Sequence, residues 1–541
     1  MDLWDMMEPD QVALDILASC YARGRDISRS LAGGVNQFVI HVYPYSGYYP
    51  NTTWPGFTTF TYLFSEHGRH QPAWDFYRDS TDYVARNQYV FQSGVPKVDL
   101  AFYSKVTSYA TIQSFYQPND LVEAGYTYEY ILLDDFSLPE AYVTDGVFAP
   151  ERQSFKAMIV RANDSMTVQG VEELVEYARA GLPIVFSGGV PSYLVSYNAS
   201  GDAYANSALQ SLVSLDNVHV VPYDKLTASI AALGIKPRTT IAASSIWYTY
   251  WRREEEAKAD YVFVYNDALG AAFNMGRSQG TVEFASTGTP YFYSAWTGDQ
   301  TRILNYTQAA NTTSIWLALA GNQSVIVAFH NDGHGRQQHG HGKESDHPAL
   351  ETKTGDAIIL ENWTLIAEHW DPPANLSDID LIAVKHNTTH HLPQLVSWQA
   401  IPGLQNVSGL GYYNTTFNWT RPTAHSHKSS QRHTAITIDF GAIVHTIHVS
   451  INGHRLPPLD LAWVKADIMP YLVDGKNAVE AVVATTLYNR LKPMRTELET
   501  CGVFASFMDT DEEPSGPFTD PSRDYGLLNA VIVTPYTVTL R

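Results

Sequence analysis

The sequence predicts a chain of several domains, with α/β units first and all-β units after them. Three observations support this. At residues 34–94 a long aromatic loop lies between an apolar run and a helical pattern, as in the C-terminal part of a (β/α)8 barrel. From about residue 95, apolar strands alternate with helices, which favours a doubly wound, mostly parallel sheet. From about residue 236, short strands follow one another with turns between them, which is typical of two β-sandwiches.

Composition limits the classes of function. The 541 residues, 45% of them apolar, leave room for three or four domains with separate cores. The formal net charge of -21 is spread without long acidic runs, which argues against nucleic acid as a partner. No apolar run approaches the length that spans a bilayer, so we expect no membrane partner. Cys20 and Cys501 are either two free thiols or one bridge, and the fold does not rest on a disulfide framework. Nothing in the sequence indicates the oligomeric state.

Twelve Asn-x-Ser/Thr sequons indicate a secreted glycoprotein. They are Asn51, Asn163, Asn198, Asn305, Asn311, Asn322, Asn362, Asn375, Asn387, Asn406, Asn414 and Asn418. The N-terminus lacks the basic segment and apolar core of a signal peptide. A barrel needs roughly 200 residues, and far fewer precede the next domain. We therefore expect that a leader and the early barrel units lie upstream of Met1.

Residues 1–94 are predicted to be the last part of the barrel, with helices at 12–21 and 23–33. The apolar Val39 and Ile40 end at His41, which we interpret as a buried strand that leads into a loop. The loop is rich in aromatic residues and carries one carboxylate, Glu66. Residues 75–94 have helical spacing and end at a glycine, which predicts a helix. The alternative is an aromatic loop that packs on a core.

This stretch resembles a motif of glycoside hydrolase family 106, the α-L-rhamnosidases, and of related fungal secreted proteins. The motif has a GVNxFVxHxY strand end, a Pro-Gly loop, a glutamate followed by a tryptophan, and a helix with an ARxQ run. The matching residues are Gly34-Val35-Asn36, His41, Tyr43, Pro55-Gly56, Glu66, Trp74 and the run ARNQYVFQSG at 85–94. The glutamate and the tryptophan are farther apart here, since His67-Gly68-Arg69-His70 intervenes.

The resemblance implies an inverting, exo-acting glycosidase with a carboxylate acid/base pair and often a bound calcium ion. Glu66 is the candidate for the water-activating base, because the nearby cationic side chains favour its ionised form; a surface ion pair is the alternative. Residues 1–94 offer no second glutamate in a comparable setting, so we expect the acid upstream of Met1. The candidates for the sugar subsite are His41, Tyr43, Tyr45, Trp54, His67, Arg69 and Trp74. Core packing is the competing role, most of all for Trp74.

Residues 95–235 are expected to form a flavodoxin-like α/β domain, with strands near 98–103, 126–133, 155–163, 183–189 and 217–223 and an amphipathic helix at 170–182. Asp134, Asp135 and Glu140 follow a strand end, where ligands often bind in open sheets. Capping of the next turn is the more frequent role of such residues. Ser187-Gly188-Gly189 fits no phosphate-binding motif and is interpreted as a plain turn.

Residues 236–405 are predicted to be a β-sandwich with a histidine-rich insertion at 330–347. The run from Trp251-Arg252-Arg253 to Asp260–Asn266 is similar to the segment that opens the β domain in the rhamnosidase family. The insertion carries His330, His334, His339, His341 and His347. Because no regular element fixes these ligands, we expect incidental metal affinity rather than a dedicated site.

Residues 406–541 resemble the jelly-roll, galactose-binding-like module shared by family 2-like glycosidases. The matching pieces are Tyr413–Phe417, Asp439–Gly441, Val449–Gly453 and Tyr471–Val479. Most of these positions make turns and core, so the module is either structural or sugar-binding.

The sequence thus predicts an exo-acting glycoside hydrolase, α-L-rhamnosidase-like, that removes terminal sugars from polysaccharides or glycosides. The alternatives are another exo-glycosidase, such as a β-galactosidase, and a non-catalytic carbohydrate-binding chain. No H-E-x-x-H, G-x-S-x-G or dinucleotide fingerprint occurs, which argues against those chemistries.

Overall fold

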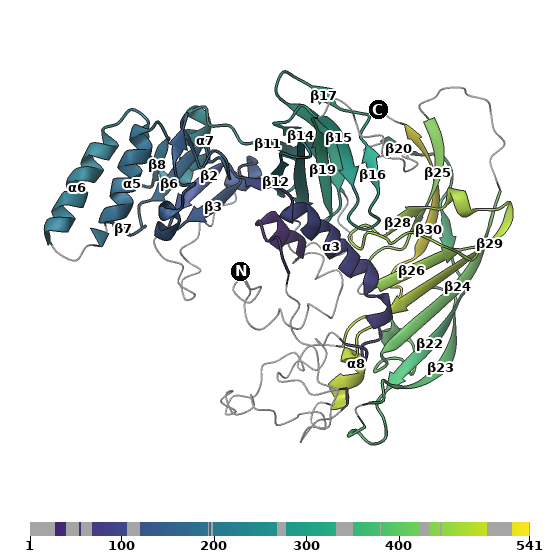
Figure 1. Ribbon diagram of the computed structural model, residues 1–541. Helices are drawn as coiled ribbons and strands as arrows, with labels where there is room; N and C mark the ends of the chain where they lie inside the picture. Colours follow the sequence, from purple (N-terminus) through teal and green to yellow (C-terminus); the bar gives the residue numbers. More distant parts are fainter. Residues whose placement is uncertain are drawn as a thin grey trace.

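A computed structural model describes residues 27–38, 54–55, 68–104, 120–192, 194–195, 199–267, 277–331, 350–378, 380–420, 432–443, 446–494 and 522–539. These residues form an α/β domain, two β-sandwiches and a helical N-terminal segment that lies against both sandwiches (Figure 1). The mixed α/β and β-rich, multi-domain architecture predicted from the sequence is therefore confirmed. Within these ranges, no helix is both long and apolar enough to cross a membrane.

The N-terminal segment contains several helices among its described residues. Residues 27–32 form one helix, and η2 (Trp74–Phe76) leads into α3 (Arg78–Gln92). The helix predicted at 75–94 is thus present, and it ends at Gln92, two residues before Gly94, whose φ is +58°. A Cβ at this position would collide with the carbonyl oxygen of Arg253, so only glycine fits.

Arg252 explains part of the rhamnosidase-like Trp-Arg-Arg pattern. Its guanidinium donates hydrogen bonds to the carbonyl oxygens of Ser93 at 3.0 Å and Gly94 at 2.6 Å. These carbonyls lie just beyond the last turn of α3, where helix carbonyls lack intrahelical partners. The arginine therefore fastens the end of α3 to the first β-sandwich.

The barrel stays a prediction. Among residues 27–38, 54–55 and 68–94 the structure contains no β-strand. The expected strand end at Val39–His41 and the expected helix at 12–21 lie outside the described residues.

The α/β domain has a five-stranded parallel sheet in the order β10-β8-β6-β2-β3. Counted along the chain this is the order 2-1-3-4-5, which is that of the flavodoxin-like fold. The strands are β2 (Leu100–Tyr103), β3 (Tyr128–Ile131), β6 (Ala157–Arg161), β8 (Ile184–Ser187) and β10 (Val218–Val221). The helices are α4 (Asp120–Glu123), α5 (Val168–Arg179), α6 (Ala199–Val213) and α7 (Leu226–Ala232). The shorter elements are η4 (Leu133–Ser137), β4 (Val143–Thr144), β5 (Val147–Phe148), β7 (Met166–Thr167), β9 (Leu194–Val195) and η5 (Tyr223–Lys225).

Alternate side chains of this sheet enter two separate cores. Ala101, Met158 and Phe186 face α5 and α6, whereas Leu100 and Phe102 belong to the cluster that includes α7. The three central strands, β2, β6 and β8, are buried on both faces, as expected for a parallel sheet covered by helices.

A buried carboxylate joins this domain to the first β-sandwich. Asp99, with no exposed surface, accepts hydrogen bonds from Nη1 of Arg238 at 2.9 Å and Nζ of Lys156 at 2.8 Å. The same side chain accepts a bond from the backbone N–H of Thr127. Arg238 directly precedes the first long strand of the sandwich.

The first β-sandwich pairs a six-stranded sheet, β1-β12-β13-β19-β15-β16, with a four-stranded sheet, β11-β14-β18-β17. Its strands are β1 (Val95–Lys97), β11 (Thr239–Ala243), β12 (Trp247–Glu254), β13 (Ala259–Asn266), β14 (Ser278–Phe284), β15 (Thr289–Tyr293), β16 (Gln300–Arg302), β17 (Thr307–Gln308), β18 (Thr313–Leu319) and β19 (Ser324–His330). Strict alternation of buried and exposed residues in β14 shows the pattern that predicted these strands.

The second β-sandwich contains the sheet β23-β22-β24-β29-β26-β27 and a five-stranded sheet built on β20-β30-β25-β28, with β21 beside β30. Its elements are β20 (Leu350–Lys353), β21 (Ile358–Leu360), β22 (Trp363–Asp371), β23 (Val384–Leu392), η6 (Trp398–Ala400), β24 (Gly409–Trp419), β25 (Arg432–Asp439), β26 (Thr446–Ile451), β27 (His454–Arg455), β28 (Lys465–Asp467), η7 (Met469–Tyr471), β29 (Gly475–Ala484), α8 (Tyr488–Leu491), η8 (Lys492–Met494) and β30 (Val531–Thr539).

The predicted boundary between the sandwiches, at residue 405, is wrong. β22 pairs with β24 along the register Thr364 to Asn414, and β20 pairs with β30. The strands at 350–392 therefore belong to the second sandwich, and the change of domain follows His330. An alternating pattern predicts which face of a strand is buried but not which sheet the strand joins.

Candidate active site

Five of the predicted site residues lie outside the described residues: His41, Tyr43, Tyr45, Glu66 and His67. Trp54, Arg69 and Trp74 are described. These three mark where the chain enters and leaves the stretch that contains Glu66.

Trp54 belongs to a core. It has no exposed surface and packs with Trp370 and with Leu487, Tyr488 and Leu491 around α8. Its indole Nε1 donates to the carbonyl oxygen of Ile382 at 3.0 Å. No face of the ring is open to a sugar. Trp54 therefore packs in a core, which was the alternative to the predicted role in the sugar subsite.

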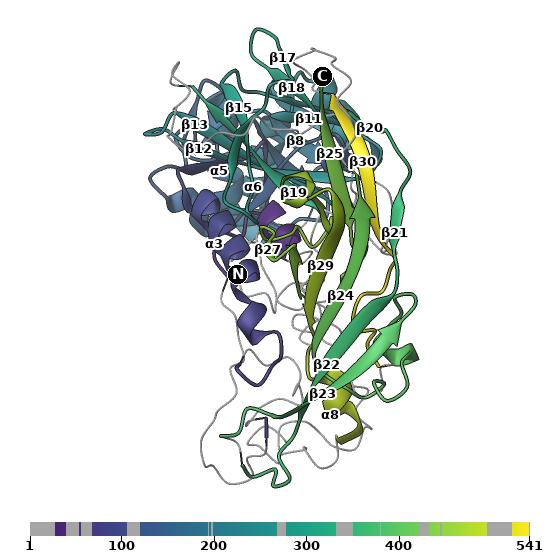
Figure 2. The same cartoon turned by 90° about the vertical axis from the view of Figure 1, so that its right-hand side faces the viewer.

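The chain returns to the same place after Glu66. The buried ring of His70 meets that of Trp54 edge-on, with centroids 6.4 Å apart. Oε1 of Gln71 accepts a hydrogen bond from the backbone N–H of Leu487 at 2.9 Å. Residues 54 and 70–71 are therefore anchored together on α8, at the lower end of β22 and β23 (Figure 2).

Arg69 and Trp74 face solvent. Arg69 is exposed, and Trp74 is 41% exposed with its ring stacked on Tyr77 at 6.3 Å. The sequence favoured Trp74 as the core residue, and the structure places Trp54 there instead. Trp74 is thus the predicted tryptophan that keeps aromatic surface open to a ligand.

The start of α3 is attached to the second sandwich through Asp79. Oδ2 of Asp79 lies 3.0 Å from Nε2 of His448 and 3.1 Å from Nη2 of Arg455. The ring of Phe76 also contacts His448 at 4.7 Å. Burial, and then the guanidinium of Arg455, lower the pKa of His448. These contacts fix the direction in which the chain leaves the predicted loop.

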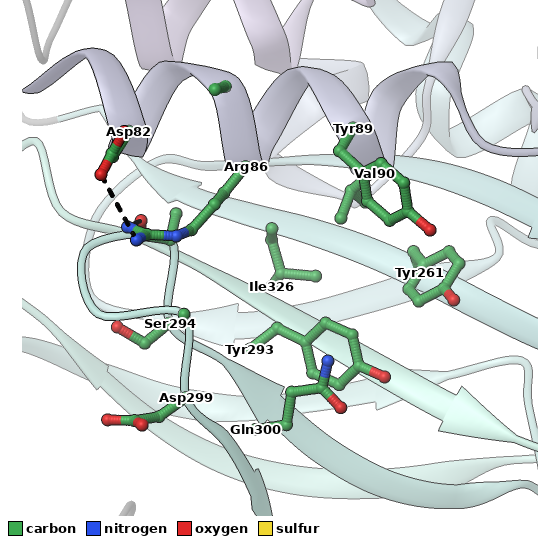
Figure 3. Close-up of a pocket in the computed structure, with 13 residues that line it drawn as sticks. Asp82, Arg86, Tyr89, Val90, Tyr261, Tyr293, Ser294, Asp299, Gln300 and Ile326 are labelled. Atoms are coloured by element: carbon green, nitrogen blue, oxygen red, sulfur yellow. Dashed lines mark hydrogen bonds and ion pairs between the residues drawn. The ribbon is translucent and has the colours of Figure 1, made fainter.

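A pocket of about 350 Å³ lies between α3 and the β15–β16 hairpin (Figure 3). Arg86 forms its polar side: Nη1 donates to the carbonyl oxygens of Ala295 at 2.8 Å and Trp296 at 2.7 Å. Its Nη2 lies 3.8 Å from Oδ2 of Asp82. Figure 3 shows three phenol rings at the other side of the pocket, those of Tyr89, Tyr261 and Tyr293.

A second pocket, of about 450 Å³, lies where α3 and both sandwiches meet. The rings of Tyr83 and Trp296 stack with centroids 4.4 Å apart. Asn87 is 1% exposed, and its Oδ1 has no hydrogen-bond partner among the described residues. Trp463, which comes just before β28 of the second sandwich, also lines the pocket, and the Arg277 guanidinium lies 5.0 Å from the centre of its ring. Aromatic rings beside a few polar groups suit the apolar and hydroxyl faces of a sugar.

Asp460 is the carboxyl group of this pocket. Its Oδ2 accepts from Nε2 of Gln323 at 2.8 Å and its Oδ1 from the backbone N–H of Ala462 at 3.0 Å. Burial raises the pKa of Asp460 to about 6, although both hydrogen bonds act in the opposite direction.

We expect Asp460→Asn to change the pH dependence of stability. Because the pKa of Asp460 is higher in the folded chain than its ordinary value near 3.9, the stabilisation is complete below about pH 4 and is lost as the pH rises through about 6. Relative to the wild type, the unfolding free energy of the variant should therefore rise between pH 4 and pH 6, by at most about 3 kcal/mol. Its melting temperature should rise with it. Thermal unfolding from pH 4 to 8 measures this, with Asp299→Asn, an exposed carboxylate of the same pocket, as the control. Parallel curves for wild type and Asp460→Asn would contradict it.

Sequence reasoning missed Asp460, Trp296 and Trp463. The segment around Asp460 was assigned only to the framework of the jelly-roll-like module. The paired Pro457 and Pro458 are the signal that could have separated it from the strands, since proline cannot continue a central strand.

Two of the acidic residues that follow β3 have structural partners. Oδ2 of Asp135 accepts from the backbone N–H of Leu132 at 2.8 Å, and Glu140 pairs with Arg152 at 2.7 Å. The N–H of Gly188 donates to the carbonyl oxygen of Val221, as in a plain strand-to-loop turn. The contacts of Asp135 and Glu140 and the turn at Gly188 thus agree with a structural role rather than with ligand binding.

The described sequons are mostly exposed. The exposed ones are Asn163, Asn305, Asn311, Asn362, Asn375, Asn387, Asn406 and Asn418. Asn414 is partly buried. Asn322 is 7% exposed and its Oδ1 accepts from the hydroxyl of Tyr265, which disfavours a glycan there in the folded chain. Asn51 and Asn198 lie outside the described residues.

Calcium, which the family resemblance implies, binds six to eight oxygen atoms. Within the described ranges, three side chains that offer metal-ligand atoms come together at His369, Asp371 and His386. This group supplies one carboxylate and does not fit calcium. Of the histidine-rich insertion, His330 is described, and its Nε2 bonds the hydroxyl of Tyr293 at 2.8 Å. His334, His339, His341 and His347 lie outside the described residues.

Comparison with solved structures gives a likeness along almost the whole chain. The rhamnosidase from Novosphingobium sp. PP1Y matches 96% of this chain with a TM-score of 0.64 and 18% identity. The chain spans 47% of that protein's length. An exo-carrageenase from Bacteroides ovatus (TM-score 0.24, 12% identity, 46% of this chain and 30% of that one) is much less similar. So is a β-galactosidase from Bacillus circulans sp. alkalophilus (TM-score 0.28, 10% identity, 47% and 45%).

No curated protein sequence matches this chain. Residues 22–276, however, match the domain of glycoside hydrolase family 106, described as alpha-L-rhamnosidase. The matched segment contains Glu66, α3, the α/β domain and the first strands of the first sandwich. Residues 22–276, just under half of the chain, thus carry a match to the glycoside hydrolase family 106 domain, and the fold along almost the whole chain is similar to that of a rhamnosidase.

Proposed function

We propose that this chain acts as an exo-α-L-rhamnosidase that hydrolyses terminal L-rhamnose from polysaccharides or glycosides. The observation that carries the proposal is the family 106 match over residues 22–276, which includes Glu66. The fold likeness to a rhamnosidase along 96% of the chain supports it. The family match also favours rhamnose as the sugar over galactose, which is the sugar that the alternative function, a β-galactosidase, would release.

Glu66 is assigned the role of general base. An inverting glycosidase places two carboxyl groups about 6.5–9.5 Å apart, so that a water molecule fits between one of them and the sugar. Ionised Glu66 takes a proton from this water, which attacks the anomeric carbon. The second carboxyl group, for which residues 1–94 offer no candidate, gives its proton to the departing oxygen. Trp54 and His70, held together on α8, fix both ends of the segment that carries the base.

A non-catalytic carbohydrate-binding role is the second candidate. The 450 Å³ pocket favours it, because Trp296, Asn87 and Asp460 offer an aromatic face beside polar groups. Such a pocket suits a sugar without requiring a reaction.

Hydrolysis of a panel of nitrophenyl glycosides separates these functions. We expect release of nitrophenol from the α-L-rhamnoside, at a rate at least about tenfold above the β-galactoside and α-L-fucoside, since a site that hydrogen-bonds its sugar rejects analogues strongly. Binding of rhamnose without hydrolysis of any glycoside would contradict the enzymatic proposal and favour the second candidate. Preference for another sugar would refute the rhamnosidase assignment alone.

We further propose an extracellular location. The many exposed sequons support it, since glycans require accessible asparagines in the secretory route. A mass decrease on enzymatic deglycosylation of the chain from its natural source tests this point.

A further inference from the structure

A cluster of histidines lies across β22 and β23, outside the pockets described above. His369 and His386 are directly opposite in the register of the two strands, and their ring centroids are 4.2 Å apart. Asp371 follows on the same face of β22, because side chains two residues apart share a face. One ligand atom from each of the three side chains lies within 4.8 Å of the other two. Two imidazoles and one carboxylate thus converge on one point.

The distance between two of these groups favours a metal over a direct hydrogen bond. Nδ1 of His386 is 3.3 Å from Oδ2 of Asp371. Charge-assisted N–H···O⁻ bonds are about 2.7–2.9 Å long. Two ligands of one tetrahedral zinc ion, each bound at about 2.0–2.1 Å, lie about 3.3 Å apart. The pair therefore has the spacing of neighbouring ligands of Zn²⁺.

Hydrogen bonds from neighbouring side chains orient the candidate ligands, as they do in known zinc sites. Nε2 of His369 bonds the hydroxyl of Thr388 at 2.8 Å, and the same hydroxyl bonds Nε2 of His390 at 2.9 Å. Nε of Arg490 donates to Oδ1 of Asp371 at 2.7 Å, which leaves Oδ2 for the cluster. Hydrogen bonds of this kind fix the tautomer of a ligating histidine and the orientation of a ligating carboxylate.

The choice of metal follows from the donor atoms. Imidazole nitrogen suits Zn²⁺ and other late transition metals, whereas Ca²⁺ and Mg²⁺ need mainly oxygen ligands. His369 is 8% exposed and the side chain of His386 is 54% exposed, so the site has one buried wall and one side open to solvent. Water can complete the coordination from the open side.

We propose that His369, Asp371 and His386 bind one Zn²⁺ ion, with water as the fourth ligand. The ion joins β22 and β23 and, through Asp371 and Arg490, connects both strands to α8. Because α8 also holds Trp54 and Gln71, the ion stabilises the surface on which the predicted catalytic loop is anchored. This site is independent of the proposed function, since a carbohydrate-binding chain would carry it as well.

The test must separate this site from the histidine-rich insertion. We would use the untagged full chain in which His334, His339, His341 and His347 are replaced by glutamine, after removal of metals with a chelator. Titration calorimetry with zinc chloride is expected to give one equivalent, and saturation with calcium chloride beforehand should not reduce it. His386→Ala should weaken zinc binding at least about tenfold, the lower end of the effect of disturbing a metal site. His391→Ala changes the same residue type on the same strand but the opposite face, and should bind like the parent.

Thermal unfolding provides a second measurement. Zinc should raise the melting temperature of the parent and of His391→Ala, because a ligand that binds only the folded state stabilises it. At the same zinc concentration it should raise that of His386→Ala by a smaller amount, since the site binds more weakly. If His386→Ala does not fold, Asp371→Asn replaces it, since the amide keeps the shape and lacks the anionic ligand. Equal zinc affinity of the His386→Ala and His391→Ala chains, or no zinc binding by the parent, would overturn the proposal.

Discussion

Replacing Glu66 with glutamine is expected to lower kcat for rhamnoside hydrolysis by about 10²–10⁴-fold, with little change in thermal unfolding. The amide keeps the size of the side chain but cannot accept the proton of the attacking water, and a positioned acid or base contributes about this factor. Steady-state kinetics on the nitrophenyl α-L-rhamnoside measures the effect.

Glu361→Gln is the matched control for Glu66→Gln. Glu361 is exposed on the second sandwich, so the same chemical change there should leave kcat unaltered. Full activity of Glu66→Gln would remove Glu66 from the mechanism without touching the family assignment, which rests on the match over residues 22–276.

Asp99→Ala is expected to lower the unfolding free energy of the α/β domain by about 3–5 kcal/mol, the cost of removing one partner of a buried ion pair. The substitution leaves the Arg238 guanidinium and the Lys156 ammonium beside an empty space in a site with no exposed surface at Asp99. The backbone N–H of Thr127 also loses an acceptor. Urea unfolding followed by far-ultraviolet circular dichroism, which reports on α5, α6 and α7, measures the loss.

The control for Asp99→Ala is Asp216→Ala. Asp216 is an exposed carboxylate of the same domain, and surface substitutions usually change stability by less than about 0.5 kcal/mol. If the two variants unfolded at the same urea concentration, the ion pairs of Asp99 would contribute nothing beyond a surface charge.

The α/β domain was the part of the fold that sequence patterns predicted best. Its five strands are short apolar runs followed by helices or turns, and local periodicity is enough to find them. The sandwich boundary was missed because β22 alternates in the same way whichever sheet it joins. Only the pairing of β22 with β24, between residues about fifty apart in the chain, decides the question.

The candidate site was harder to predict for a related reason. Trp54 and Trp74 both occur among aromatic and polar neighbours, so the local sequence does not show that Trp54 is the buried one. The apolar surroundings of Trp54 come from Trp370 and from residues 487–491, far along the chain. Asp460 likewise acquires its raised pKa only where α3 and the two sandwiches meet. The resemblance to family 106, in contrast, depended on a contiguous motif, and it was confirmed.

The contact between Gln71 and Leu487 has a consequence for how the protein is made. These residues are 416 positions apart, and the bond from Trp54 to Ile382 spans 328 positions. At a translation rate of about 5–20 residues per second, Gln71 waits about 20–80 s on the ribosome before its partner exists. The segment that carries Glu66 is therefore synthesised early and fastened late, and a ribosome that stalls before α8 releases a chain whose loop has no anchor.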